Sequence, residues 1–272
     1  VIGYTDAPAA MSLPAFMATA IVAVMANSTD TPNVDVLITG GSGFIGAALT
    51  EALIERGQSV CCADVAGFER LEHLAGNPSL HLQTLDVLDV DAVNQAVEAA
   101  NAVIHLAAVV GVDRYIDKPD QVLDVNIMGT RNVAVACARL ERPLLVSSTS
   151  EVYGKTSTDL QESADMTIGR LWRSRWSYAL SKATAEQYLH AWGRTGLHFV
   201  VVRYFNVYGP RMDRPGEGRV LSKFIGHIQN KEPLPLVDGG GAVRAFCYIE
   251  DAVVATLALL DRLQEHGDVS GR

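Results

Sequence analysis

The sequence predicts an α/β fold built on a doubly wound parallel sheet, followed by a small C-terminal region. Short β-branched runs alternate with stretches of helical apolar spacing from residue 34 to residue 208, an order typical of crossover units. A glycine-rich turn, TGGSGFIG, stands between the first such run and the first helical stretch. Beyond residue 208 the alternation weakens and Pro and Gly become frequent, so we expect an irregular region there.

The individual elements follow from the periodicity of the apolar residues. Strands are expected at residues 34–39, 59–64, 80–87, 102–108, 143–148 and 198–205. Helices are expected at residues 44–57, 89–100, 119–141 and 176–196. Strands that alternate with helices in this way pair in parallel, so one sheet with helices on both faces is predicted.

Composition narrows the class of protein. The 272 residues are 49% hydrophobic and 19% charged, which is ordinary for a globular chain. The net charge of −9 argues against a broad cationic surface, so nucleic acid is not an expected partner. The four cysteines, Cys61, Cys62, Cys137 and Cys247, fit neither a metal-binding spacing nor a disulfide framework. We therefore expect reduced core thiols in a cytoplasmic protein, and no metal.

The N-terminal stretch is unusual because residues 7–29 contain no charged side chain. A membrane span or a secretory segment is one interpretation. Against it, no Lys or Arg precedes the stretch, Pro8 and Pro14 interrupt it, and many of its residues are Ala. We favour a helix that docks on the protein or on a partner subunit, and no membrane association is expected.

The glycine-rich turn predicts a dinucleotide-binding site. Gly40, Gly43 and Gly46 lie where glycine lets the backbone turn tightly and approach a pyrophosphate at a helix N-terminus. The second strand ends at Asp64, whose carboxylate can accept the hydroxyls of an adenosine ribose and would repel a 2′-phosphate. A plain strand–helix turn is the alternative, but strand, turn, helix and acid in this order favour NAD over NADP.

A tyrosine and a lysine on one predicted helix form a candidate acid–base pair. Tyr178 and Lys182 in YALSK are at positions i and i+4, so both side chains leave the same helix face. A lysine cation beside a phenol favours the phenolate, which would make Tyr178 a base near neutral pH; a surface pair is the alternative for this spacing alone. Together with the glycine turn and Thr149, these residues resemble the extended short-chain dehydrogenase/reductase family, in its nucleotide-sugar branch.

This resemblance runs from residue 34 to the end of the chain and implies a Rossmann-like sheet that binds NAD. Asn126 resembles a helix asparagine of the family with a structural or proton-relay role. His105 is interpreted as structural, because no acid–base or metal partner accompanies it in the sequence. The residues implied to bind NAD are Gly40, Gly43, Phe44, Ile45, Gly46, Asp64, Asp86, Val87, Leu106, Ala107, Ala108, Asn126, Tyr178 and Lys182.

The chain is accordingly divided into three parts. Residues 1–32 are an apolar extension, residues 33–209 an NAD-binding domain, and residues 210–272 a substrate-binding region that is expected to be incomplete, since family members normally continue further. The resemblance also implies a homodimer in which two helices of each copy form a four-helix core. The apolar residues expected at that interface are Val133, Cys137, Leu140, Ala183, Tyr188 and Trp192.

Through the segment SSTSEVYG, the resemblance also implies a reaction. Thr149 takes the position of the family's catalytic Ser/Thr, which hydrogen-bonds the sugar hydroxyl that Tyr178 deprotonates while the C4 hydride moves to NAD. A 4,6-dehydratase resembles TDEVYG, and Ser150 here replaces its acidic residue. The triplet Thr149, Ser150 and Glu151 is similar to that of UDP-glucuronic acid decarboxylases, in which Ser and Glu assist the loss of carbon dioxide. The expected catalytic residues are Thr149, Ser150, Glu151, Tyr178 and Lys182.

Candidate substrate-binding residues lie later in the chain. Arg244, before Ala-Phe, resembles an arginine that lies by the sugar or its phosphates in the decarboxylases. Asn206 resembles the entry to the nucleotide-sugar pocket, and Arg211 and Arg219 are phosphate-side candidates, with a solvated helix face as the alternative for Arg219.

Three hypotheses for function follow. Decarboxylation of a UDP-uronic acid, such as UDP-glucuronate, is the first. A UDP-sugar 4-epimerase is the alternative, because residues 109–125 depart from the decarboxylases and are closer to epimerase-like members. An NAD-binding regulator without activity is the alternative of another class, although such a protein has no need of Thr149, Tyr178 and Lys182 together.

Overall fold

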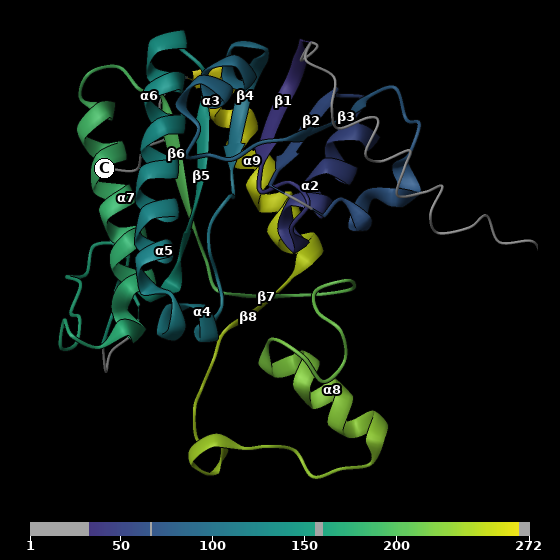
Figure 1. Cartoon of the computed structure of the whole chain (residues 1–272), viewed down its shortest axis with the longest axis vertical. Helices are drawn as coiled ribbons and strands as arrows, with labels where there is room; N and C mark the ends of the chain where they lie inside the picture. Colours follow the sequence, from purple (N-terminus) through teal and green to yellow (C-terminus); the bar gives the residue numbers. More distant parts are fainter. Residues whose placement is uncertain (1–32, 66, 156–159, 267–272) are drawn as a thin grey trace, which may run out of the picture.

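A six-stranded parallel β-sheet forms the centre of the protein (Figure 1). The computed structural model describes residues 33–65, 67–155 and 160–266, so the apolar extension predicted at 1–32 lies outside the described residues. The strand order is β3-β2-β1-β4-β5-β6. The order reverses between β1 and β4, and the crevice at the carboxyl ends of these strands is where doubly wound sheets bind ligands. The predicted fold class is confirmed.

Helices cover both faces of this sheet. Its strands are β1 (Val34–Thr39), β2 (Val60–Asp64), β3 (Leu80–Thr84), β4 (Ala100–His105), β5 (Leu144–Thr149) and β6 (Phe199–Tyr204). One face is packed by α3 (Val90–Glu98), α6 (Thr130–Leu140) and α7 (Ser177–Gly193), and the other by α2 (Phe44–Glu55) and α9 (Ile249–His266). Leu37 of β1 points into the first layer and Val36 and Ile38 into the second. Burial on both faces explains why the strands read as continuous apolar runs.

The long helix predicted at residues 119–141 is interrupted. The helix α5 (Pro119–Leu123) is followed by a wider π-helical turn, η2 (Asp124–Gly129), and then by α6. A side chain cannot be accommodated at Gly129, because a Cβ atom there would lie 2.5 Å from Cγ2 of Val87. Single π-turns often occur at functional sites. Here the turn directs the side chain of Asn126 towards the loop that follows β4.

The strand β3 ends at Thr84 instead of residue 87. Asp86 forms a turn at this point: its Oδ1 atom accepts a hydrogen bond from the backbone N–H of Leu88 at 2.9 Å, and its carbonyl accepts one from Asp89 at 3.0 Å. Asp89 then caps the N-terminus of α3 with its side chain. Aspartate favours such turns, so the strand stops before its apolar pattern does.

Beyond β6 the chain leaves the sheet and later returns to it. The short strands β7 (Asn206–Tyr208) and β8 (Phe246–Tyr248) pair in parallel, and α8 (Val220–Asn230) lies between them in the chain and below the main sheet in Figure 1. The final helix α9 packs against the sheet beside α2. The segment predicted as a substrate-binding region therefore also supplies one helix of the central core. Among the described residues, none of the helices combines the length and apolarity needed to cross a membrane.

Two residues expected at a dimer interface lie inside the protomer. Val133 and Cys137 on α6 are fully buried in the layer that α3, α6 and α7 form on the sheet. The expectation that they face a partner is wrong for these two residues, because the neighbouring helix α3 covers a side of α6 that the sheet does not reach. Tyr188 and Trp192 on α7 stack on each other, with their ring centroids 5.2 Å apart.

Candidate active site

The glycine turn lies at the carboxyl end of β1 and leads directly into α2. Gly40 has a φ of 72°, and a Cβ atom there would lie 2.5 Å from the backbone nitrogen of Ala107. A Cβ on Gly46 would lie 2.4 Å from the carbonyl oxygen of Gly40. Only glycine fits these two positions, and the turn packs against the segment after β4 that contains Leu106 and Ala107. This cradle, at the N-terminus of α2, fits the pyrophosphate of a dinucleotide.

Asp64 lies at the end of β2, beside this turn. Its Oδ2 atom accepts a hydrogen bond from the hydroxyl of Ser42 at 2.7 Å, and its Oδ1 atom accepts one from the backbone N–H of Val65 at 2.8 Å. The carboxylate is thus held at the edge of the cradle, where a ribose hydroxyl would reach it. The role of Ser42 was missed in the sequence, because nothing in the motif pattern distinguishes this serine from a loop residue.

Phe44 and Ile45 begin α2 and pack in the apolar layer between α2 and the sheet. Val87 is buried against Gly129, and its carbonyl oxygen accepts a hydrogen bond from Asn132 at 3.0 Å. These residues therefore fix the backbone around the expected cofactor site. Their direct contact with NAD stays a prediction.

Two polar residues predicted around β4 have structural partners. His105 shares hydrogen bonds with Thr39 at 2.7 Å and with Thr130 at 3.0 Å, and burial lowers its pKa to about 3. It is therefore neutral at physiological pH, and the structural interpretation of His105 is confirmed. Asn126 accepts a hydrogen bond from the backbone N–H of Val109 at 2.7 Å and donates one to the hydroxyl of Ser181 at 3.1 Å. It joins the loop after β4 to α7.

The expected redox residues meet where β5 and α7 lie side by side. Thr149 is the last residue of β5, and its hydroxyl acts on the phenol of Tyr178 and lowers the pKa of that phenol. The ammonium group of Lys182, which is almost completely buried, donates to the carbonyl oxygen of Ser147 at 2.9 Å. The structure thus brings Thr149, Tyr178 and Lys182 together, as the sequence predicts.

The electrostatic expectation for Tyr178 needs correction. Burial raises the pKa of its phenol above the ordinary value, and Tyr115 and Glu151 raise it further, while Thr149 and Arg219 lower it. Burial also lowers the pKa of Lys182, to about 8. The nearby lysine therefore does not by itself make Tyr178 a base near neutral pH.

Glu151 has a partner that the sequence analysis missed. Arg175 forms an ion pair with it, with Nη1 of the arginine 2.6 Å from Oε2 of the glutamate. Arg175 precedes the helix predicted at residues 176–196, so helix spacing gave no signal that its side chain lies near the site. Glu151 belongs to the short helix η3 (Ser150–Tyr153), and Arg175 to η4 (Ser174–Trp176). Ser150 begins η3 directly after Thr149.

A second aromatic residue at the site was also missed. Tyr115, on α4 (Val112–Asp117), stacks on Tyr178 with ring centroids 4.8 Å apart and an interplanar angle of 4°. It comes from the segment between residues 108 and 126 whose sequence departs from the decarboxylases. The stacking makes this segment part of the site, and it contributes to the burial of the Tyr178 ring.

The four candidate substrate residues separate into groups. Arg219, just before α8, lies over the ring of Phe44 at 5.6 Å, and its charge acts on Tyr178. Arg211, in contrast, binds both carboxylate oxygens of Glu51 on α2, at 2.6 and 2.7 Å. Arg219 is thus placed at the expected site, and Arg211 is engaged as a structural ion pair.

The other two candidates lie on the small sheet. The side-chain amide of Asn206, on β7, donates to the carbonyl oxygen of Ala245 at 2.8 Å. Arg244 precedes β8 and donates to the carbonyl oxygen of Val243 at 2.7 Å. Both lie at the exposed edge formed by β7 and β8, and their contact with a substrate stays a prediction.

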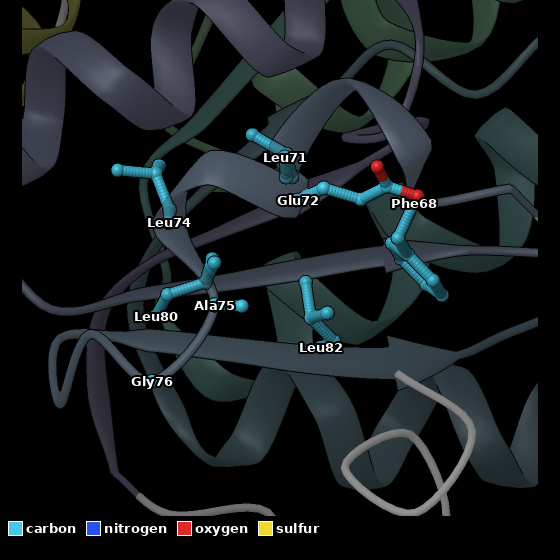
Figure 2. Close-up of a pocket in the computed structure, with 8 residues that line it drawn as sticks. All are labelled: Phe68, Leu71, Glu72, Leu74, Ala75, Gly76, Leu80 and Leu82. Carbon is cyan, nitrogen blue, oxygen red and sulfur yellow. The ribbon is translucent and has the colours of Figure 1, made fainter. Parts of the chain in front are cut away.

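An apolar pocket elsewhere does not belong to this site. Figure 2 shows it between η1 (Glu69–Leu74) and β3. It is lined by Phe68, Leu71, Glu72, Leu74, Ala75, Gly76, Leu80 and Leu82. None of the predicted site residues contributes to it. Among the described residues, no group of His, Cys, Asp and Glu side chains is arranged to hold a metal ion.

Comparisons with known proteins agree with this geometry. Residues 36–270 match the model of the family described as NAD dependent epimerase/dehydratase family. UDP-N-acetyl-alpha-D-glucosaminuronate decarboxylase of Bacillus cytotoxicus is 37% identical over 229 residues, which cover 83% of this chain and 70% of the relative. UDP-D-apiose/UDP-D-xylose synthase 2 of Arabidopsis thaliana is 31% identical and covers 87% of this chain and 71% of the relative.

A solved structure is similar in fold over most of the chain. UDP-glucuronic acid 4-epimerase from Bacillus cereus, in complex with UDP-glucuronic acid and NAD, superposes with a TM-score of 0.74 and 28% identity, covering 84% of this chain and 73% of the other. The glycine cradle, Asp64, and the Thr149–Tyr178–Lys182 cluster are the elements that such chemistry requires. The chain belongs to the NAD dependent epimerase/dehydratase family, a family of enzymes whose cofactor is NAD.

Proposed function

We propose that the protein uses NAD to oxidise a UDP-linked uronic acid at C4 and then releases its carboxylate as carbon dioxide. Tyr178 takes the proton of the C4 hydroxyl, and Thr149 holds that hydroxyl in place. NAD supplies the hydride acceptor. The resulting 4-keto acid breaks the bond between C5 and the carboxylate, and the electron pair is delocalised onto the ketone oxygen. Protonation at C5 and return of the hydride to C4 give a UDP-pentose, with NAD unchanged overall.

The observation that carries this proposal is the ion pair of Glu151 and Arg175 beside the redox cluster. Arg175 lies 2.6 Å from Glu151, and its guanidinium has further N–H donors that suit a substrate carboxylate. We assign the proton exchange near C5 to Glu151, whose charge acts on Tyr178. The names of the two relatives, a uronate decarboxylase and an apiose/xylose synthase, point in the same direction.

The experiment incubates the protein and NAD with UDP-glucuronic acid, UDP-N-acetylglucosaminuronic acid, UDP-glucose and UDP-N-acetylglucosamine, and identifies products by mass spectrometry. The two neutral sugars are matched controls that differ from the acids only at C6. We expect carbon dioxide and a UDP-pentose or its 4-keto form from at least one acid, and no product of lower mass from the neutral sugars. A C4 epimer that retains its carboxylate would replace the proposal with a 4-epimerase. NAD binding without any turnover would favour the regulator.

We further propose a homodimer built on α6 and α7. Val135 on α6 is exposed, at 39%, and the Tyr188–Trp192 stack lies on α7. Association about a two-fold axis is the commonest form of homo-oligomer. Light scattering at micromolar concentration is expected to give twice the protomer mass, and Val135→Glu to reduce it. Ile228→Glu, at an exposed position on α8, is the control that leaves the mass unchanged. A wild-type monomer would contradict the dimer.

We also propose that the protein works in the cytoplasm. Its four cysteines are free thiols, and three of them, Cys61, Cys62 and Cys137, are buried. Free cysteines are typical of reducing compartments. Fractionation of cells that express the full-length protein tests the location, and recovery in an oxidising compartment would contradict it.

A further inference from the structure

An arginine of η1 joins the cofactor cradle to the segment that leaves the main sheet. This segment, residues 209–245, connects β7 to β8 and carries α8 (Figure 1); we call it the arm. Arg70 donates through Nε to the carbonyl oxygen of Arg211 at 3.0 Å and through Nη2 to that of Met212 at 3.2 Å. Its Nη1 atom donates to the carbonyl oxygen of Ser42, in the glycine turn, at 3.4 Å. One guanidinium thus holds two carbonyl groups of the arm and one of the cradle.

The contact between Arg70 and Arg211 is reciprocal. The Nη1 atom of Arg211 donates to the carbonyl oxygen of Arg70 at 3.0 Å, and its two Nη atoms bind the carboxylate of Glu51 on α2. His73, also on η1, lies with its Nε2 atom 3.1 Å from the same carboxylate. Arg211 has a φ of 65°, a left-handed conformation that persists in a residue with a side chain where the surrounding contacts enforce it. We call Arg70, Arg211 and Glu51 the interlock.

The consequence of the interlock is geometric. The side chain of Arg211 is 45% exposed, and ion pairs at such positions contribute little to stability. The next residue, Met212, is buried in the apolar layer that contains α2 and α9. The interlock and this buried side chain therefore fix the direction in which the arm leaves the core of the protein.

The candidate residue that depends on this direction is Arg219. Asp213 follows the interlock in the arm, and its Oδ2 atom accepts a hydrogen bond from the backbone N–H of Arg219 at 3.0 Å. The guanidinium of Arg219 lies over the ring of Phe44, the first residue of α2, at 5.6 Å. Its charge also lowers the pKa of the Tyr178 phenol. A continuous series of contacts thus leads from the glycine turn, through the interlock, to the cation beside the candidate active site.

We propose that Arg70 is a positioning residue for substrate binding: through the interlock, it keeps Arg219 beside the cofactor cradle, where it binds the phosphates of a nucleotide sugar. This inference rests on the proposed function, which supplies the anionic ligand. A cation on a loosely held arm would have to be immobilised when the ligand binds, and this ordering costs affinity. An arm that is already fixed avoids the cost. The interlock therefore acts on binding, and not on the reacting atoms.

Hydrogen exchange in the protein without substrate tests whether Arg70 fixes the arm. Arg70→Met is expected to accelerate exchange in residues 211–224 by roughly tenfold, the scale of one lost hydrogen bond to a charged group. Exchange in α9 should not change. Arg56→Met is the matched control, because it removes an exposed ion pair with Asp261 that also involves α2 but not the arm. Unchanged exchange in Arg70→Met, or equal acceleration of residues 211–224 in Arg56→Met, would overturn the proposal.

Steady-state kinetics with NAD and UDP-glucuronic acid distinguish positioning for substrate from a general structural role. Arg70→Met is expected to raise the KM of the nucleotide sugar roughly tenfold, while kcat and the affinity for NAD change by less than about twofold. Arg70→Lys, which keeps the charge, should recover part of the loss. A variant with an unchanged KM would overturn the proposal, whether or not kcat or NAD affinity falls. If the wild type does not act on UDP-glucuronic acid, the proposed function fails, and the exchange experiment still decides whether Arg70 fixes the arm.

Discussion

Arg175 and Glu151 form an ion pair, 2.6 Å long, at the edge of the Tyr178 site. The arginine side chain is 50% exposed and the glutamate side chain 27%. Ion pairs with this exposure contribute little to stability, typically about 1 kcal/mol or less. In the proposed reaction, the role of this pair is instead to hold a donor fork and an acid–base group together beside the redox cluster.

Arg175→Met is expected to impair the reaction of uronic acids far more than it destabilises the fold. Loss of a hydrogen bond to a charged group typically costs about 1.5–3 kcal/mol, so kcat/KM for UDP-glucuronic acid should fall roughly tenfold to a hundredfold. Thermal unfolding should change little. Arg170→Met is the matched control, because this arginine lies in the same loop but packs over Trp172. Equal kinetics for the two variants would show that Arg175 has no role in binding the acid.

Glu151→Gln is expected to separate the two steps of the reaction. In the proposed mechanism, Tyr178 and Lys182 take part in the oxidation, and Glu151 acts only once the 4-keto acid exists. Removing a positioned acid–base group typically slows its step by about 10²–10⁴. In single turnover with UDP-glucuronic acid, NADH absorbance should therefore appear near the wild-type rate while carbon dioxide release is slowed. Tyr178→Phe should abolish both signals. Release of carbon dioxide by Glu151→Gln at the wild-type rate would exclude the role.

The sequence was sufficient for features in which a residue type has one physical use. Gly40 is needed because a side chain would collide with Ala107, and the Tyr178–Lys182 spacing places both on one helix face. It was insufficient where several partners compete for one side chain. Arg211 looks like a phosphate ligand, yet Glu51, distant in the sequence, binds its guanidinium. Such pairings depend on the folded chain.

Periodicity failed for a related reason. It cannot distinguish which neighbour buries an apolar face, so Cys137 was assigned to a partner subunit although α3, α6 and α7 enclose it. Periodicity also missed the π-turn at Asn126. Asn126 hydrogen-bonds the loop after β4, and a contact of this kind leaves no trace in the apolar pattern of the helix.

Asp64→Ala is expected to reduce the preference for NAD over NADP. Wild-type protein should bind NAD at least about tenfold more tightly, a difference of about 1.4 kcal/mol, because the carboxylate accepts ribose hydroxyls and repels a 2′-phosphate. Ser42→Ala removes the hydroxyl that orients Asp64 and should reduce the preference by a smaller amount. Calorimetric titration of each variant with both nucleotides measures this. Equal affinities in the wild type would contradict the assignment.

His105 is expected to make stability fall as the solution becomes acidic. Its pKa is lowered from 6.5 to about 3 in the folded protein, so below about pH 6.5 the unfolded chain binds a proton that the folded protein does not. The free energy of unfolding should therefore decrease by up to about 1.4 kcal/mol per pH unit as the pH falls from 6.5 towards 3, and this contribution is fully retained above 6.5. His105→Gln removes the titrating group while keeping a donor and an acceptor for Thr39 and Thr130. Urea denaturation near pH 7 and pH 5 should give a smaller difference for this variant than for the wild type, and His266→Gln, which removes an exposed imidazole, serves as the control. If His105→Gln loses as much stability as the wild type between these two pH values, the imidazole is not held neutral in the core.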